Sequence, residues 1–282
     1  MRIDLHSHTT VSDGTDTPDE LLALARAIGL DVLGVTDHDT FDHLPAVRLA
    51  ARREGIELLE GMELSCEFQG KSVHLLAYGM DPENADLLEE MALVRAGRTD
   101  RLALMLERLG ELGVPVTEAE VMAQVGEAPS IGRPHVADAM VARGHVASRD
   151  QAFRDFLADD GPAYVPRYYV DLHAGIELIH AAGGLAIIAH PWGRSSREVL
   201  TEDVLTELVR TRGLDGFEVD HEDHDEADRA RLRALADALD VLGTGASDHH
   251  GAGKPTMQLG CNLTAPPVYA ELLRRLASRS TR

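Results

Sequence analysis

Two histidines separated by one residue, His6 and His8, lie near the start of the chain, at the end of a short apolar segment. Side chains alternate between the two faces of a β-strand, so both imidazoles are expected to point the same way. Two neighbouring imidazoles on a rigid strand suit a transition-metal ion. Two exposed histidines in an N-terminal strand would give the same pattern, so the pair alone does not establish a metal site.

Further histidines and carboxylates stand at the ends of the other segments that we predict as strands. They are Asp13, His38, Glu63, His74, His190, Asp248 and His250. In parallel α/β folds, bound molecules lie at the carboxyl ends of the strands. These residues are therefore expected to converge on one site at that end of the sheet. One histidine at a strand end is commonly structural, but the coincidence at so many strand ends predicts a site for several metal ions.

Strand-like and helix-like segments alternate along the chain, which predicts an α/β fold. Strands are predicted at 2–7, 32–36, 57–68, 72–78, 185–189, 216–219 and 241–244, and the first helices at 18–29 and 42–54. The short link at 69–71 predicts a hairpin between the third and fourth strands. The repeated order of strand and helix predicts a parallel sheet that closes, or nearly closes, as a barrel.

Residues 99–166 interrupt this alternation. Helices predicted at 99–110, 117–125, 133–143 and 148–159 follow one another with no convincing strand between them. We therefore predict a barrel made of residues 1–98 and 167–282, with a helical insertion of residues 99–166 that covers the active site.

The composition of the chain restricts its partners. The 282 residues, 44% of them hydrophobic, suit one large α/β domain with a substantial core. The formal charge of −21, from 27 basic and 48 acidic residues, disfavours binding to duplex nucleic acid. A small anionic substrate stays compatible if bound metals make a pocket positive.

Targeting signals also restrict the class of protein. No apolar signal segment is recognisable, and no run of about 18 apolar residues predicts a membrane span. Cys66 and Cys261 form no disulfide framework and fit a reducing compartment. We therefore expect a cytoplasmic protein with no membrane partner.

The ordered set of motifs resembles the polymerase-and-histidinol-phosphatase (PHP) family of metal-dependent phosphoesterases. The residues that carry the resemblance are His6-x-His8 with Asp13, Thr36-Asp37-His38-Asp39, Glu63, His74, His190-Pro191 and Asp248-x-His250. The resemblance implies a distorted, TIM-like barrel of seven β/α units that holds up to three divalent ions. It implies one ion at His6, His8, Glu63 and Asp248, a second at Glu63, His74 and His190, and a third at Asp13, His38 and His250.

The ligand types indicate the metal and its chemistry. Mixed imidazole and carboxylate ligands favour Mn²⁺, with Zn²⁺ or Fe²⁺ as alternatives, over Ca²⁺. Two or three such ions outweigh the charge of the ligand carboxylates and attract phosphate. A metal-bound hydroxide is the expected nucleophile. Asp37 is expected to orient a ligand rather than to react, and the acid that protonates the leaving group is not predicted.

The choice of substrate is expected to depend on residues outside the ligand set. Arg133 and His135 begin a predicted helix of the insertion, where a guanidinium and free backbone N–H groups can bind phosphate. Family members that act on nucleotides carry a similar Arg-x-His that faces the metals. Further candidates for substrate binding are Trp192 for a base, Arg194 and Lys254 for phosphate, and His221 in the pocket wall. A helix cap, a packed tryptophan and a solvated loop would explain the same residues.

The resemblance is closest to members that remove the 3′-phosphate from nucleoside 3′,5′-bisphosphates, some of which also shorten RNA from its 5′ end. Alternatives are hydrolysis of a cyclic phosphodiester or of another small phosphorylated metabolite. A non-catalytic metal-dependent binding module is a third class, which the complete ligand set disfavours. The oligomeric state is not predicted.

Overall fold

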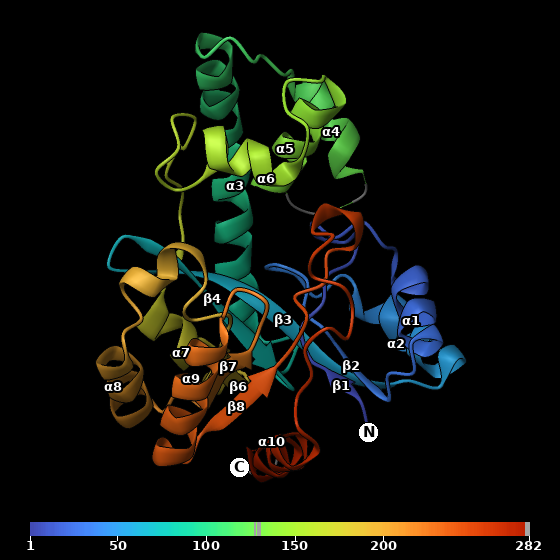
Figure 1. Cartoon of the computed structure of the whole chain (residues 1–282), viewed down its shortest axis with the longest axis vertical. Helices are drawn as coiled ribbons and strands as arrows, with labels where there is room; N and C mark the ends of the chain where they lie inside the picture. The colour runs from blue at the N-terminus through green and yellow to red at the C-terminus, as the bar shows by residue number, and fades with distance from the viewer. Residues whose placement is uncertain (127, 129–130, 280–282) are drawn as a thin grey trace.

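Seven strands form a nearly closed barrel in the computed structural model, which describes residues 1–126, 128 and 131–279 (Figure 1). They are β1 (Ile3–Asp4), β2 (Val32–Val35), β3 (Glu57–Phe68), β4 (Lys71–Tyr78), β6 (Leu185–Ile188), β7 (Gly216–Asp220) and β8 (Leu242–Gly245). Their order around the sheet is β1-β2-β3-β4-β6-β7-β8. A parallel bridge between Ser7 and His249 links the two edges beyond β1 and β8. The predicted α/β barrel is therefore confirmed.

The sheet is mixed rather than wholly parallel. β4 runs antiparallel to both β3 and β6, because the tight turn at Gln69 and Gly70 sends the chain straight back along β3. The other neighbours in the barrel pair in parallel. A further strand, β5 (Val170–Asp171), pairs with β3 outside the barrel order. It was not predicted, since two residues are too short to show a period.

Helices cover the outside of the barrel and close one end of it. They are α1 (Pro18–Ala27), α2 (Leu44–Glu54), α7 (Leu172–Ala181), α8 (Glu202–Arg212), α9 (Glu226–Leu239) and α10 (Pro266–Arg279), with 3₁₀ turns η2 (Arg194–Glu198) and η3 (Gly251–Gly253). Tyr269 and Leu272 of α10 pack with Leu5, Tyr78 and Ile187 in one buried apolar cluster. This cluster fills one end of the barrel and leaves the other end for polar side chains.

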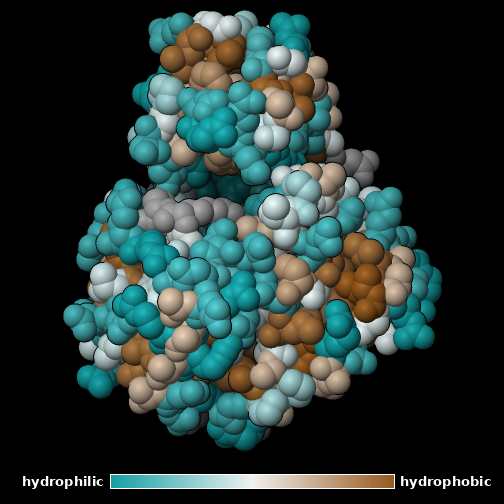
Figure 2. All heavy atoms as spheres, in the orientation of Figure 1, coloured by the Kyte–Doolittle hydropathy of each residue, from teal (hydrophilic) through white to brown (hydrophobic). Residues whose placement is uncertain are grey.

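A second group of helices stands on the barrel (Figure 1). It consists of α3 (Ala85–Glu111), α4 (Glu118–Val125), α5 (Arg133–Ala142), α6 (Arg149–Ala152) and a π-helical turn, η1 (Phe153–Leu157). α3 rises from the barrel as one continuous helix, so the boundary predicted at residue 99 falls inside it. These helices pack around an apolar core of their own, which includes Val121, Val136 and Leu157. Figure 2 shows the surface hollowed between this helical part and the barrel.

Among the described residues, no helix combines the length and the apolar composition needed to cross a bilayer.

Gly34 of β2 lies against the backbone of Leu5, the residue that follows β1. A Cβ at Gly34 would overlap the backbone carbonyl of Leu5. We expect Gly34→Ala to lower the free energy of unfolding by about 1–3 kcal/mol, because β1 must move to make room. Thermal denaturation measures the change. Gly110→Ala in α3, where a Cβ meets no atom within 4 Å, is the control and should be neutral or stabilising. Equal melting temperatures for Gly34→Ala and the wild type would contradict the prediction.

Candidate metal centre

Glu63 of β3 lies at the centre of five histidine side chains. They are His6, His8, His38, His74 and His190. The Oε2 atom of Glu63 lies 3.3 Å from His6 Nε2 and 3.1 Å from His8 Nε2. Its Oε1 atom lies 2.7 Å from His74 Nδ1 and 3.3 Å from His190 Nε2. The side chain is only 1% exposed, so its charge is screened by imidazoles rather than by water.

Asp248 and Asp13 extend the cluster on either side. Asp248 Oδ1 lies 3.3 Å from Nε2 of both His6 and His8. Asp13 Oδ1 lies 3.3 Å from His250 Nε2, and Asp13 Oδ2 lies 3.8 Å from His38 Nε2. The barrel therefore brings all nine residues predicted as metal ligands into one cluster.

Three groups within the cluster have ligand atoms that all lie within 4.8 Å of one another. They are His6, His8, Glu63 and Asp248; His8, Asp13, His38 and His250; and His38, Glu63 and His74. The first group coincides with one predicted site. In the second, His8 joins the three predicted residues, and in the third, His38 takes the place predicted for His190. Which residue ligates which ion stays a prediction.

The electrostatics of the cluster suit cations. Burial alone would raise the pKa of Glu63, but neighbouring imidazoles hold it well below its usual range. Against the effect of burial, imidazoles lower the pKa of Asp13 in the same way, and Lys254 followed by imidazoles lowers that of Asp248. Burial lowers the pKa of His38, and burial followed by Lys254 lowers that of His250 to about 3. These groups already have the protonation state that metal ligands need.

His6 and His8 behave differently. Burial would lower the pKa of each imidazole, but the surrounding carboxylates reverse this effect. The pKa of His6 is raised, and that of His8 is raised to about 9. Binding of a cation by these two residues therefore releases protons, so metal affinity should increase with pH.

Two buried polar atoms show that the cluster fits metal ions. His38 Nδ1 and Glu63 Oε2 lie 3.1 Å apart, and neither has a hydrogen-bond partner in the described part of the chain. Polar atoms buried without a partner cost stability, and a shared cation would satisfy both. Imidazole nitrogens with carboxylate oxygens are also the donor set that Mn²⁺, Zn²⁺ and Fe²⁺ accept.

Asp37 lies beside the cluster and holds a loop in place. Its carboxylate accepts hydrogen bonds from Thr9 N–H at 2.8 Å, Thr9 Oγ1 at 2.7 Å and Ser12 Oγ at 2.5 Å. Asp13 belongs to this loop. These contacts tie Asp37 to the loop, and its supporting role at the site stays a prediction.

Glu218 of β7 is a functional candidate that the sequence did not reveal. It is fully buried, its Oε1 accepts a hydrogen bond from His6 Nδ1 at 3.1 Å, and its Oε2 accepts one from the backbone N–H of His190 at 2.7 Å. Burial would raise its pKa, but His6 lowers it to about 2. The bond to Nδ1 directs His6 Nε2 toward Glu63 and Asp248. A carboxylate in the middle of an apolar strand was the available signal.

A pocket of about 620 Å³ lies between the cluster and the helical part. Its lining includes Asp13, His38, His74, His190 and His250 from the cluster, and Arg133, Arg149, Phe153 and Arg154 from the helices. Arg133 Nη1 donates to Leu157 O at 2.8 Å and to Asp159 Oδ1 at 2.6 Å. Lys254 also lines the pocket, and its Nζ lies 2.8 Å from Asp248 Oδ2. Both cations therefore line the pocket, and their binding of substrate stays a prediction.

His135 and His221 are buried next to the cluster rather than open to the pocket. His135 is 4% exposed, and its Nδ1 accepts a hydrogen bond from Gly132 N–H at 2.9 Å. His221 is fully buried, with Nε2 at 3.7 Å from Asp248 Oδ2. Neither has a side chain that a substrate reaches in this structure.

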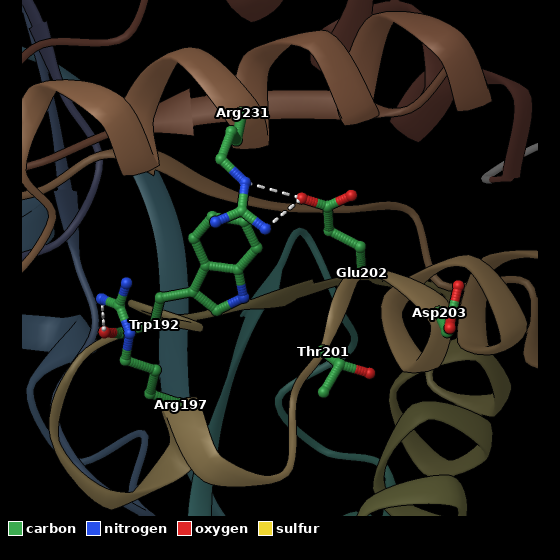
Figure 3. A pocket seen from close by; sticks show the side chains of 6 residues that line it. All are labelled: Trp192, Arg197, Thr201, Glu202, Asp203 and Arg231. Carbon is green, nitrogen blue, oxygen red and sulfur yellow. Dashed lines mark hydrogen bonds and ion pairs between the residues drawn. The ribbon is translucent and has the colours of Figure 1, made fainter.

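Trp192 is not brought into the pocket. It lines a separate surface hollow with Arg197 and Arg231 (Figure 3). Its indole N–H donates to Leu200 O at 2.7 Å, and Arg231 lies 4.9 Å from the ring centre. Trp192 is not among the residues that line the pocket beside His190, so the structure gives no support to stacking of a base on Trp192. The side chain of Arg194 lies outside the described part of the chain.

Comparisons with known proteins agree with this geometry. A model of the PHP domain matches residues 4–110. The 3′,5′-nucleoside bisphosphate phosphatase of Chromobacterium violaceum is 31% identical over 99% of this chain and 98% of its own length. The 5′-3′ exoribonuclease of Haemophilus influenzae is 32% identical over 88% of this chain and 90% of its own.

A solved structure supports the same assignment. A candidate metal-dependent phosphoesterase from Bifidobacterium adolescentis superimposes with a TM-score of 0.91 at 38% identity, over 96% of this chain and 95% of that one. The similarity extends over both the barrel and the helical part. With strand-end histidines and carboxylates converging on one pocket, the chain belongs to the PHP family of metal-dependent phosphoesterases.

Proposed function

We propose that the protein removes the 3′-phosphate from nucleoside 3′,5′-bisphosphates and also acts on short RNA that carries a 5′-phosphate. The pocket is the observation that supports this proposal, because predicted metal ligands form one wall and Arg133 belongs to the opposite one. A substrate with two phosphates can place one at each wall. The similarity over nearly the full length to a 3′,5′-nucleoside bisphosphate phosphatase adds support.

The nine clustered residues would hold two or three divalent ions, and we propose Mn²⁺, with Zn²⁺ or Fe²⁺ as alternatives. When bound, such ions activate water and neutralise the charge of the reacting phosphate. Glu63 would contact the ions from the centre of the cluster. Glu218 orients the ring of His6, and Asp37 fixes the loop that carries Asp13. Arg133 and Lys254 contact the anionic substrate, while His135 and His221 support the walls behind them.

An assay of the purified protein with Mn²⁺ tests the proposal. The substrates are adenosine 3′,5′-bisphosphate, a 5′-phosphorylated oligoribonucleotide and a cyclic phosphodiester. We expect phosphate release from the bisphosphate and mononucleotide release from the RNA. Hydrolysis of the cyclic phosphodiester alone would replace the proposal by a cyclic phosphodiesterase. If the fully metal-loaded protein hydrolyses none of these substrates, the non-catalytic binding module is the remaining alternative.

Arg133→Ala is expected to raise KM for the bisphosphate about tenfold with little change in kcat. The side chain lines the pocket away from the metal ligands, and a charge-assisted hydrogen bond contributes about 1.5–3 kcal/mol. Binding that is equal in the ground and transition states changes KM rather than kcat. Steady-state kinetics measure both constants. Arg143→Ala, an exposed arginine at the other end of α5, is the control. An unchanged KM removes Arg133 from the binding site.

A further inference from the structure

Four arginines gather where the helical part joins the barrel. Arg98 and Arg101 lie about one turn apart on α3, Arg133 begins α5, and Arg167 precedes β5. We call them the neck arginines. Arg98 is 7% exposed and Arg101 is 6% exposed. Arg133 and Arg167 are partly buried, and such a concentration of positive charge is unexpected in a chain with a net charge of −21.

Two of the neck arginines are paired with carboxylates. Arg98 forms an ion pair with Asp39 and donates to Ser65 Oγ at 2.9 Å. Arg133 Nη1 lies 2.6 Å from Asp159 Oδ1. These contacts balance two of the four positive charges.

The other two form no ion pair with the described residues. Arg167 donates to Tyr168 O at 2.9 Å and stacks over the ring of Tyr169 at 3.8 Å. Arg101 has no hydrogen bond within the described part of the chain. Burial, followed by the repulsion of neighbouring arginines, lowers the pKa of Arg101 to about 9 and that of Arg167 to about 10. Asp39, which is already paired with Arg98, and Tyr169 offset this effect only in part.

Unpartnered N–H groups mark the same place. Arg98 Nε, Arg101 Nη1 and Arg167 Nε are buried and have no hydrogen-bond partner among the residues described. Folded proteins seldom leave buried donors unmatched, because each forfeits its hydrogen bonds to water. The three guanidinium groups are also close enough to repel one another, so an anionic acceptor among them would relieve both the repulsion and the missing hydrogen bonds.

One of the neck arginines, Arg133, reaches the pocket, and another, Arg98, lies between it and the metal centre. Arg133 lines the pocket, and a Cβ on Gly132, which precedes α5, would lie 3.7 Å from Arg98 Nη1. Asp39, the partner of Arg98, directly follows the predicted metal ligand His38. An acceptor reaching the cluster from the pocket would therefore lie beside the reacting site.

We propose that the neck arginines form a receptor for a dianionic phosphoryl group. Four arginines and two paired aspartates leave two positive charges, which match a phosphate monoester at neutral pH. Planar guanidinium groups also bind phosphate oxygens in pairs. The occupant is either the substrate phosphate that is not hydrolysed, in which case the receptor rests on the proposed function, or free inorganic phosphate. For the anion to enter, Arg133 must break its ion pair with Asp159 and contact the anion instead.

Thermal denaturation of the full-length protein after treatment with a chelator tests the receptor without the metal centre. Inorganic phosphate should raise the melting temperature above that in sodium chloride of equal ionic strength. Arg101→Met should weaken apparent phosphate affinity at least tenfold, and it removes no hydrogen bond to the described residues, so it should fold. Arg167→Met is a second test. Arg210→Met, on the exposed face of α8, should retain the rise in melting temperature caused by phosphate. A rise equal to that of the wild type in both Arg101→Met and Arg167→Met overturns the receptor.

Kinetics with Mn²⁺-loaded protein then distinguish the two sources of the phosphoryl group. If the substrate supplies it, Arg101→Met raises KM for adenosine 3′,5′-bisphosphate about tenfold and leaves KM for adenosine 3′-monophosphate unchanged. If free phosphate is the occupant, the ratio of the two KM values stays at the wild-type value, while the loss of phosphate stabilisation persists. If the proposed function is wrong, neither nucleotide is hydrolysed, yet the thermal result still decides whether the receptor exists.

Discussion

Glu63→Gln is expected to lower kcat about a thousandfold or more. Glutamine keeps the shape of the side chain but removes the charge that lies among five imidazoles. A metal site contributes several kcal/mol to a phosphoryl-transfer step, and about 4 kcal/mol corresponds to a thousandfold change in rate. Because Glu63 belongs to two of the three potential ligand groups, its loss should disturb more than one ion.

Two measurements check this expectation. Elemental analysis should show less bound metal in Glu63→Gln, and kinetics at saturating substrate should show the fall in kcat. Glu67→Gln, on an exposed position of the same strand, should behave like the wild type. Treatment of the wild type with a chelator should reproduce the loss, and added Mn²⁺ should restore the wild type but not the variant. Full turnover with full metal content in Glu63→Gln would contradict a central role for this carboxylate.

The strand ends could be predicted because each strand is bounded by signals within a few residues. The apolar run of β2 stops at Val35, and the segment 36–39 follows at once with polar residues. Parallel pairing then places this end next to the end of β1. Local patterns therefore sufficed to predict the strand ends and their α/β arrangement, whereas the grouping of the nine residues around ions came from the resemblance to the PHP family.

Two features needed the three-dimensional structure. Glu218 lies 212 residues from His6 along the chain, so no local spacing could connect them. The switch from α6 to a π-helical turn at Phe153 depends on packing and leaves no periodic signal. The first half of α3 was missed for a different reason: the buried Leu87, Met91 and Val94 do have helical spacing, so the signal existed in the sequence.

The strained backbone at the site also depends on distant contacts. His190 and Asp248 have positive φ angles of 30° and 51°, which are uncommon for residues other than glycine. Such strain persists only where surrounding contacts hold it, and the bond from His190 N–H to Glu218 is one of these contacts. Glu218 therefore supports two predicted ligands at once. It contacts the imidazole ring of His6 and the backbone N–H of His190.

Glu218→Gln is expected to weaken Mn²⁺ affinity about 10–100-fold, as loss of a hydrogen-bonding partner behind a metal ligand does. The carboxylate accepts from His6 Nδ1 and from His190 N–H. An amide has one acceptor oxygen and one donor nitrogen, so it cannot replace both bonds. The variant should lose either the orientation of the His6 ring or the support of the His190 backbone.

The dependence of activity on Mn²⁺ concentration separates this positioning role from a general loss of structure. In Glu218→Gln the concentration of Mn²⁺ for half-maximal activity should rise 10–100-fold, and excess Mn²⁺ should restore most of kcat. A merely unfolded fraction would lower kcat without moving that midpoint. Glu222→Gln, an exposed carboxylate just beyond β7, should leave both quantities unchanged. The substitution removes the contacts that Glu218 makes with His6 and His190. An unaltered Mn²⁺ midpoint in Glu218→Gln would therefore show that Glu218 does not position these ligands.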